Sequence, residues 1–192
     1  MRLFIAVPIP AEVKTAIADV LAGLSRAGAD VKWVRPENLH LTLSFLGEHR
    51  AEDVSAIKAA VDRATRGTAA FSLAFSRAGV FESWERPRVL WLGIERGADA
   101  LGGLAAGLHR QLVQTGIEMA DKGRPFAAHL TLGRFRSRRH VERLRDVAAS
   151  FAAPQAMEMP VGRLILYESR LFPEGPRYTA LAESKLPAAF GA

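Results

Sequence analysis

Apolar residues recur along the chain at two spacings, and each spacing predicts one type of element. Short runs of alternating or continuous apolar residues predict strands, and apolar residues three to four positions apart predict helices. The stretch 11–26 has the helical spacing, with Val13, Ile17, Leu21 and Leu24 on one face. The pattern predicts strands at 2–7, 31–34, 39–46, 71–81, 89–94, 127–132, 157–167 and 178–186, and helices at 11–26, 51–66, 99–115 and 138–151.

The order of these elements predicts an α+β fold with mostly antiparallel sheets, because strands follow one another in pairs beside helices. No linker rich in Pro, Gly or Ser divides the chain, so we expect residues 1–192 to form a single domain. The two halves run through their elements in a similar order. This similarity predicts two pseudo-symmetric lobes, with helices outside and a cleft between them.

One tetrapeptide occurs twice, at 40–43 and again at 129–132, 89 residues further on. Each copy reads His-Leu-Thr-Leu, follows a polar turn or loop and precedes a predicted helix. In a strand, side chains alternate between the two faces, so His40 and Thr42 point one way. We expect Leu41, Leu43 and Phe45 to point the other way and to pack under a helix. In two lobes related by a pseudo-twofold axis, the two His-Thr pairs would face each other.

Two facing imidazoles are suited to acid–base catalysis, since an unperturbed histidine titrates near neutrality. One histidine can take a proton from water while the other gives a proton to a departing alkoxide. The hydroxyls of Thr42 and Thr131 can donate to the anionic oxygens between them. The chemistry that fits is hydrolysis of a phosphodiester, with His40 and His129 as the catalytic pair. Neutral histidine also binds zinc, but no Asp, Glu or Cys recurs beside both motifs to complete a ligand set, so we expect no metal.

Composition narrows the class of protein. The chain has no cysteine, which excludes disulfide scaffolds, thiolate zinc sites and cysteine nucleophiles. The apolar start ends at Pro8, too early for a secretory signal, and no apolar run approaches a membrane span of about 18 residues. We therefore expect a cytoplasmic monomer without membrane contact. The net charge of +6 and the excess of Arg over Lys are compatible with a phosphate-bearing partner. They also fit a genome that prefers Arg codons.

The sequence around both motifs resembles the two-histidine (2H) phosphoesterases, most closely the bacterial and archaeal RNA 2',3'-cyclic phosphodiesterases, formerly called 2'-5' RNA ligases. The likeness extends over nearly the whole chain. It rests on the opening strand, on the residues before and after the first motif, on those after the second motif, and on three further segments. These stretches are 2–6, 33–39, 44–48, 87–93, 133–134, 166–169 and 175–178.

The resemblance implies two α+β lobes around a cleft and a reaction that opens a 2',3'-cyclic phosphate to a 2'-phosphate. In that family's scheme His40 is the acid and His129 the base, with Thr42, Thr131 and Arg134 binding phosphate oxygens. Ala128 departs from the family, which commonly has proline there. Strict alternation would also turn Arg134 away from His129, so its place in the site requires a β-bulge at Gly133.

The resemblance implies that RNA ends or cyclic nucleotides are the substrate and that no cofactor is needed. The sequence also has no GxGxxG or Walker loop, so it does not indicate a nucleoside-triphosphate cofactor. Two alternatives remain open: 2'-5' RNA ligation through the same site, and an RNA-end binding module without turnover. Both copies of the motif keep their histidine and their threonine, and this argues against pure binding. A binding module needs positive charge more than it needs two titratable groups.

Residues outside the repeat offer weaker candidates. His49, His109 and His140 lack a threonine partner, and we expect them to be surface or structural. Six arginines lie between 134 and 145, either as an RNA-attracting run or as a solvated helix face. Trp84, in a predicted loop, could stack a base.

Overall fold

The computed structural model describes residues 1–151 and 157–188. Its elements follow the predicted order closely, with most boundaries within a few residues. The helices are α1 (Ala11–Ser25), α2 (Asp53–Arg66), α3 (Ala98–Gln114) and α4 (Val141–Ser150), with a 3₁₀ turn η1 at Pro36–Asn38. The strands are β1 (Arg2–Pro8), β2 (Val31–Trp33), β3 (His40–Glu48), β4 (Phe71–Ser83), β5 (Arg86–Arg96), β6 (His129–Phe135), β7 (Glu158–Val161), β8 (Arg163–Phe172) and β9 (Gly175–Lys185).

Two antiparallel sheets form the two lobes. The first sheet has the strand order β3-β1-β8-β9, and the second has the order β2-β6-β5-β4-β7. Strands from the two ends of the chain pair in the first sheet, where β1 lies beside β8. Neither lobe is therefore a contiguous half of the sequence, although each lobe contains one copy of the repeated tetrapeptide. The α+β fold predicted from the sequence is confirmed.

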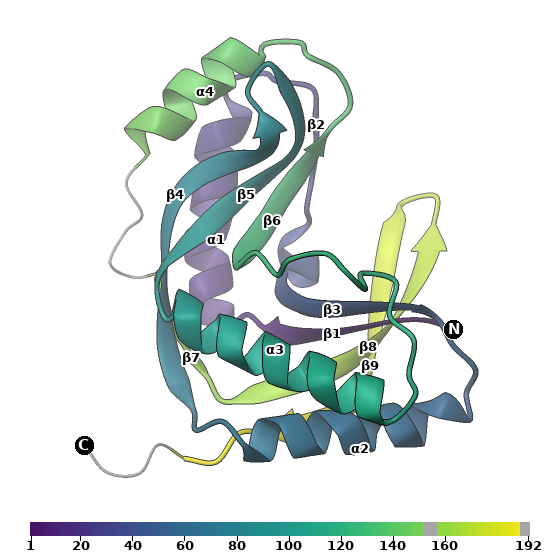
Figure 1. Cartoon of the computed structure of the whole chain (residues 1–192). Coiled ribbons are helices and arrows are strands. Elements are labelled where there is room, and N and C mark those ends of the chain that lie inside the picture. The colour runs from purple at the N-terminus through teal and green to yellow at the C-terminus, as the bar shows by residue number, and fades with distance from the viewer. Residues whose placement is uncertain (152–156, 189–192) are drawn as a thin grey trace.

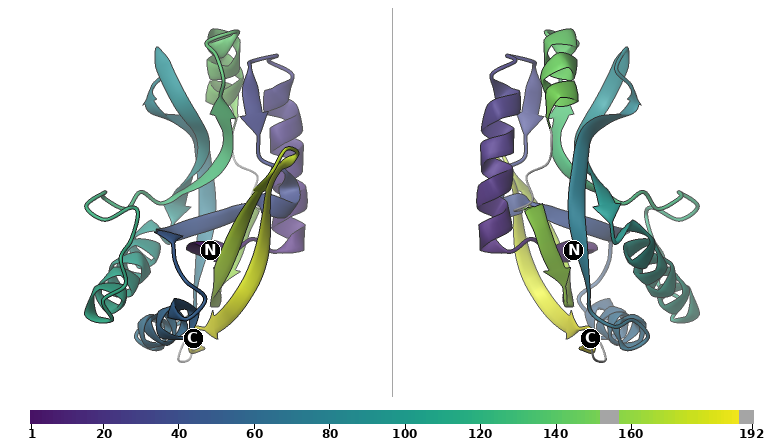
Figure 2. Two further views of the ribbon diagram at one scale, coloured as in Figure 1. Left: turned by 90° about the vertical axis from the view of Figure 1, so that its right-hand side faces the viewer. Right: turned by 90° about the vertical axis from the view of Figure 1, so that its left-hand side faces the viewer.

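The helices divide between the lobes and leave the facing sides of the sheets uncovered. In the upper lobe of Figure 1, α1 packs against α4, and α4 packs on β4. In the lower lobe, α2 packs against α3 and also covers β8 and β9. Figure 2 shows both pairs of helices on the outside of the molecule. One continuous apolar core, which includes Ile5, Ile17, Leu41, Leu104 and Leu130, joins the sheets to the helices.

The predicted strand at 157–167 is wrong in one respect, because it is two strands in different sheets. β7 pairs with β4 in the second sheet, whereas β8 pairs with β1 in the first. The break falls at Gly162, which lies between the two strands. Apolar spacing does not show this break, because buried apolar residues occur on both sides of it.

Gly97 at the start of α3 provides a test of the fold. Its φ is +82°, and a Cβ there would lie 2.5 Å from the Ser72 carbonyl oxygen. Gly97→Ala should therefore lower the free energy of unfolding by about 1–3 kcal/mol. Gly102→Ala, inside the same helix with nothing within 4 Å, should raise it by about 1 kcal/mol. Urea denaturation of both variants measures the difference, and equal midpoints would contradict this description of the α3 start.

Candidate active site

The two copies of the tetrapeptide meet between the lobes. His40 is the first residue of β3, His129 is the first residue of β6, and the two strands contact each other. The beginnings of both strands lie near the centre of the molecule in Figure 1. The histidines are close enough for the charge of His129 to lower the pKa of His40. The structure thus brings together, from opposite halves of the chain, the pair that the sequence predicted to act together.

Both histidine rings are held by the same hydrogen bond. Nδ1 of His40 lies 2.7 Å from the Asn38 carbonyl oxygen, and Nδ1 of His129 lies 2.7 Å from the Ala127 carbonyl oxygen. A carbonyl oxygen can only accept, so Nδ1 carries the hydrogen in each ring. In the neutral form the lone pair is then on Nε2. Nε2 is therefore the nitrogen of each ring that can take up a proton.

Each motif strand contains a β-bulge at the last residue of the repeated tetrapeptide. On β3, Thr42 pairs with Ala6 but Ser44 pairs with Ile5, so Leu43 is the extra residue. On β6, Thr131 pairs with Trp91 but Gly133 pairs with Leu90, so Leu132 is the extra residue. A bulge shifts the alternation of all later side chains by one position.

The bulges bring the residue five positions after each histidine into the cleft. On β6 that residue is Arg134, which lines the cleft. The β-bulge that its place in the site required is present just before it, at Leu132 and Gly133. On β3 it is Phe45, and here the sequence prediction was wrong. Phe45 does not pack under a helix with Leu41 and Leu43; it is 45% exposed and lines the cleft. Strict alternation placed it on the wrong face because the bulge has no glycine to signal it.

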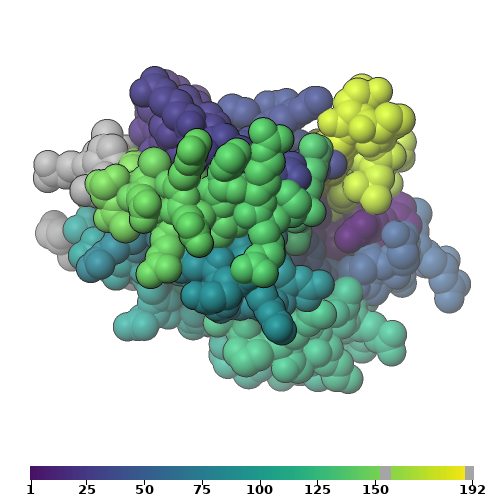
Figure 3. Space-filling model, turned by 90° about the horizontal axis from the view of Figure 1, so that it is seen from above, coloured from purple at the N-terminus to yellow at the C-terminus, as the bar shows by residue number. Residues whose placement is uncertain are grey.

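The cleft between the lobes has a volume of about 770 Å³. It is lined by His40, Thr42, Thr131 and Arg134, together with the β8–β9 hairpin. Seen from above, the yellow hairpin and the green β6–α4 segment stand on either side of a recess (Figure 3). His129 is not among the lining residues. It lies two residues before Thr131 on β6, with the ring of Phe81 edge-on at 4.7 Å.

Burial favours the neutral form of both imidazoles. The rings of Phe4 and Tyr178 lie 4.8 and 5.2 Å from the His40 ring. Burial lowers the pKa of His40 from 6.5 to about 4, against the raising effect of the Asn38 carbonyl. Burial also lowers the pKa of His129, and the charge of Arg134 lowers it further. A bound anion would raise both pKa values, because it stabilises the imidazolium form.

The sequence did not predict the part played by the β8–β9 hairpin. Asn38, whose carbonyl holds His40, donates from Nδ2 to the Pro176 carbonyl oxygen at 3.0 Å. Arg35 donates to the Glu174 carbonyl oxygen at 3.0 Å, so two hydrogen bonds fix the hairpin beside His40. Tyr178 of this hairpin lines the cleft, and burial raises the pKa of its hydroxyl, which therefore stays a donor. Its only sequence signal was its place in the family-like segment 175–178.

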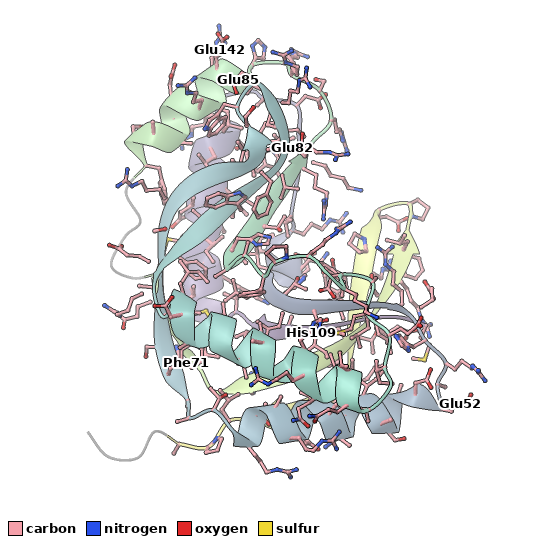
Figure 4. All side chains as sticks on the ribbon, viewed as in Figure 1. Glu52, Phe71, Glu82, Glu85, His109 and Glu142 are labelled. Carbon is pink, nitrogen blue, oxygen red and sulfur yellow. The ribbon has the colours of Figure 1, made fainter. Side chains whose placement is uncertain are left out.

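The remaining histidines lie outside the cleft. Nε2 of His49 lies 3.0 Å from the Glu118 carbonyl oxygen, and its Nδ1 lies 3.4 Å from the Asp53 carboxylate, so it is structural. His109 is exposed on α3 (Figure 4), and His140 precedes α4. Trp84 is partly buried against the core. Among the described residues, no group of three His, Cys, Asp or Glu side chains is placed to hold a metal ion, and no helix is long and apolar enough to cross a membrane.

His40, Thr42 and Thr131 line the cleft that the two lobes share, and His129 lies two residues before Thr131 on β6. This is the arrangement expected of a two-histidine phosphoesterase. The family model of the LigT-like phosphoesterases matches the chain twice, over residues 7–91 and 92–178, and the chain belongs to this family. Each match contains one copy of the tetrapeptide. The resemblance drawn from the sequence is thereby confirmed.

Individual relatives are similar over almost their full length. An RNA 2',3'-cyclic phosphodiesterase of Thermotoga maritima is 34% identical over 183 residues, covering 95% of this chain and 94% of the relative. One from Escherichia coli K12 is 33% identical, covering 94% and 93%. The crystal structure of E. coli LigT in apo form superposes with a TM-score of 0.78 at 30% identity, covering 97% of both chains. E. coli LigT has also been solved in complex with ATP, 3'-AMP, NADP+ and phosphate.

The lowered pKa of His40 predicts a pH-dependent stability. Between about pH 6.5 and pH 4 the unfolded chain binds more protons at this residue than the folded chain, so the free energy of unfolding falls as pH falls. The contribution is complete above pH 6.5 and lost as pH falls through about 4. His40→Gln should therefore lose less stability than the wild type between pH 7 and pH 4.5 in urea denaturation. His109→Gln is the matched control, and an equal loss in His40→Gln would contradict the burial of His40.

Proposed function

We propose that the protein hydrolyses 2',3'-cyclic phosphates, at RNA ends or on nucleotides, to 2'-phosphomonoesters. The observation that carries this proposal is the pair of identically held imidazoles, each with Nε2 as its free nitrogen. Two groups that exchange protons suit hydrolysis of a phosphodiester more than binding alone. The names of the relatives and the nucleotide complexes of E. coli LigT support the same substrate class.

In the mechanism that we infer, His129 is the base and His40 the acid. Nε2 of His129 takes a proton from water, and the water oxygen forms the new bond to phosphorus. The bond from phosphorus to the 3' oxygen breaks, and Nε2 of His40 gives its proton to that oxygen. Thr42 and Thr131 donate hydroxyl hydrogen bonds to the non-bridging oxygens, and Arg134 balances their charge. No step requires a metal or a cofactor.

Substrate binding would prepare His40 for its role as acid. Before substrate binds, the lowered pKa of the His40 imidazole leaves this ring neutral at neutral pH. The cyclic diester carries one negative charge, and an anion beside the ring favours the protonated form. The acid would therefore take up its proton as the substrate enters.

We also propose, from the sequence, that the protein acts as a monomer in the cytoplasm. Light scattering after gel filtration tests the oligomeric state.

The direct test uses RNA that ends in a 2',3'-cyclic phosphate, with product identification by phosphorus NMR. We expect a 2'-phosphate as the sole product. His40→Ala and His129→Ala should each reduce turnover at least ~10²-fold, in line with general acid–base contributions of roughly 10²–10⁴. His109→Ala, on the exposed face of α3, is the control. Binding without turnover in the wild type would favour the RNA-end binding module, and near-full activity in either cleft variant would refute the two-histidine mechanism.

The pH dependence should differ between the free and the bound protein. kcat/KM reports the free protein, in which the pKa values of both histidines are lowered, so its bell should lie on the acidic side of neutrality. kcat reports the complex, in which the anion raises them, so its bell should lie at higher pH. The two limbs of each profile report apparent pKa values of the coupled histidine pair, and neither value belongs to one residue alone. If the pH profiles of kcat/KM and kcat coincide, the lowered pKa values of the histidines in the free protein are contradicted.

Because only protons and hydrogen bonds are used, activity should persist in excess chelator. Hydrolysis of a 2',3'-cyclic nucleotide before and after dialysis against EDTA measures this. Loss of activity that zinc or magnesium restores would show that a metal takes part.

A further inference from the structure

The cleft carries many more cations than the proposed reaction needs. Among the described residues, only two carboxylates line it, those of Asp121 and Glu174. The carboxylate of Asp121 is already engaged, since it accepts hydrogen bonds from the Ser44 hydroxyl at 3.2 Å and from the Phe45 backbone N–H at 2.8 Å. The cations that line the cleft are Arg2, Lys32, Arg35, Arg124, Arg134 and Arg136. None of these six forms an ion pair with any part of the chain that the structure describes.

Three of these cations form a row along the edge of the second sheet. Lys32 on the edge strand β2 is the direct cross-strand partner of Arg134 on β6. Arg136 follows β6, and its backbone N–H donates to the Asp30 carbonyl oxygen at 2.9 Å. All three side chains are exposed. Like charges directly opposite each other destabilise a sheet. A phosphate bound by Lys32 would relieve this repulsion.

Two acidic residues of the same lobe, Glu82 and Glu85, already have basic neighbours away from this row. Glu82 pairs with Arg88 at 3.1 Å. A hydrogen bond from Ser83, followed by smaller effects that include the charges of Arg145 and Arg138, lowers the pKa of Glu85. Glu85 and Glu142 lie at the outer end of the lobe (Figure 4). Arg88, Arg138 and Arg145 thus have acidic neighbours, whereas Lys32, Arg134 and Arg136 form no ion pair within the described residues.

We propose that Lys32 and Arg136 bind the phosphodiester backbone of an RNA strand next to its reacting end. The reacting phosphate would take the threonines and Arg134, so a mononucleotide leaves Lys32 and Arg136 without an anionic partner. A strand with further phosphates supplies one for each. The site therefore prefers an oligonucleotide end over a cyclic mononucleotide. The preference in turnover rests on the proposed function, whereas backbone binding by this row does not.

Binding is tested with a fluorescein-labelled RNA decamer that ends in a 3'-hydroxyl and cannot react. Its affinity is measured by fluorescence anisotropy at several salt concentrations. Each phosphate contact contributes about 0.7 to the slope of log K against log salt for single strands. Lys32→Gln and Arg136→Gln should each reduce the slope by roughly 0.7. Arg110→Gln, an exposed arginine on α3 outside the cleft, is the matched control and should keep the wild-type slope.

Turnover is tested with a cyclic-phosphate-ended decamer and a 2',3'-cyclic mononucleotide. The ratio of their kcat/KM values should favour the decamer in the wild type and should fall several-fold in Lys32→Gln and Arg136→Gln. Unchanged slopes in both variants, or an unchanged ratio, would overturn the proposal. If no variant and no wild-type protein opens the cyclic phosphate but the slopes still fall, the proposed function fails while the backbone site stands.

Discussion

The active site depends on one hydrogen bond that the fold makes twice. In each lobe a histidine Nδ1 donates to the carbonyl oxygen two residues earlier, at 2.7 Å. This bond fixes the orientation of the ring and leaves Nε2 as the reactive nitrogen. It also requires that the segment before each motif strand be held in place. The residues that do so come from distant parts of the chain.

Each carbonyl acceptor lies in a segment that is fastened to the first sheet. Asn38 is tied by its side-chain amide to Pro176 in the β8–β9 hairpin. Ala127 belongs to the loop between α3 and β6, and this loop is fastened to β3. Asp121 of the loop accepts from Phe45 N, and Ala120 N donates to Phe45 O at 2.9 Å. The loop that leads into His129 is thus bonded to β3, the strand that begins with His40.

The duplication is geometric, but the two halves of the site are not chemically equivalent. The same β-bulge occurs at the end of both tetrapeptides, yet it delivers an apolar Phe45 in one lobe and a cationic Arg134 in the other. His40 is enclosed by Phe4 and Tyr178, and burial lowers its pKa to about 4, whereas the pKa of His129 is lowered by burial together with the charge of Arg134. This asymmetry supports the assignment of different roles to two residues in identical sequence contexts.

Local patterns predicted the elements, the fold class and the histidine pair, since apolar spacing and a repeated motif are properties of short stretches. Three features depended on contacts that short stretches do not encode. The bulge at Leu43 reversed Phe45, the break at Gly162 divided one expected strand between two sheets, and the hairpin brought Tyr178 to His40. Arg134 was anticipated from the family resemblance, and Gly133 allowed the bulge that its place in the site required; β3 has Ser44 at the same position.

The central claim, that His40 and His129 act as separate acid and base, is tested most directly with an activated aryl phosphodiester. Its leaving group departs without a proton, so His40→Ala should retain much of the wild-type rate and lose the alkaline limb of the pH profile. His129→Ala should remain strongly impaired. Rescue of His129→Ala instead would reverse the two roles, and equal impairment of both variants with this ester would contradict a division of labour between the two histidines.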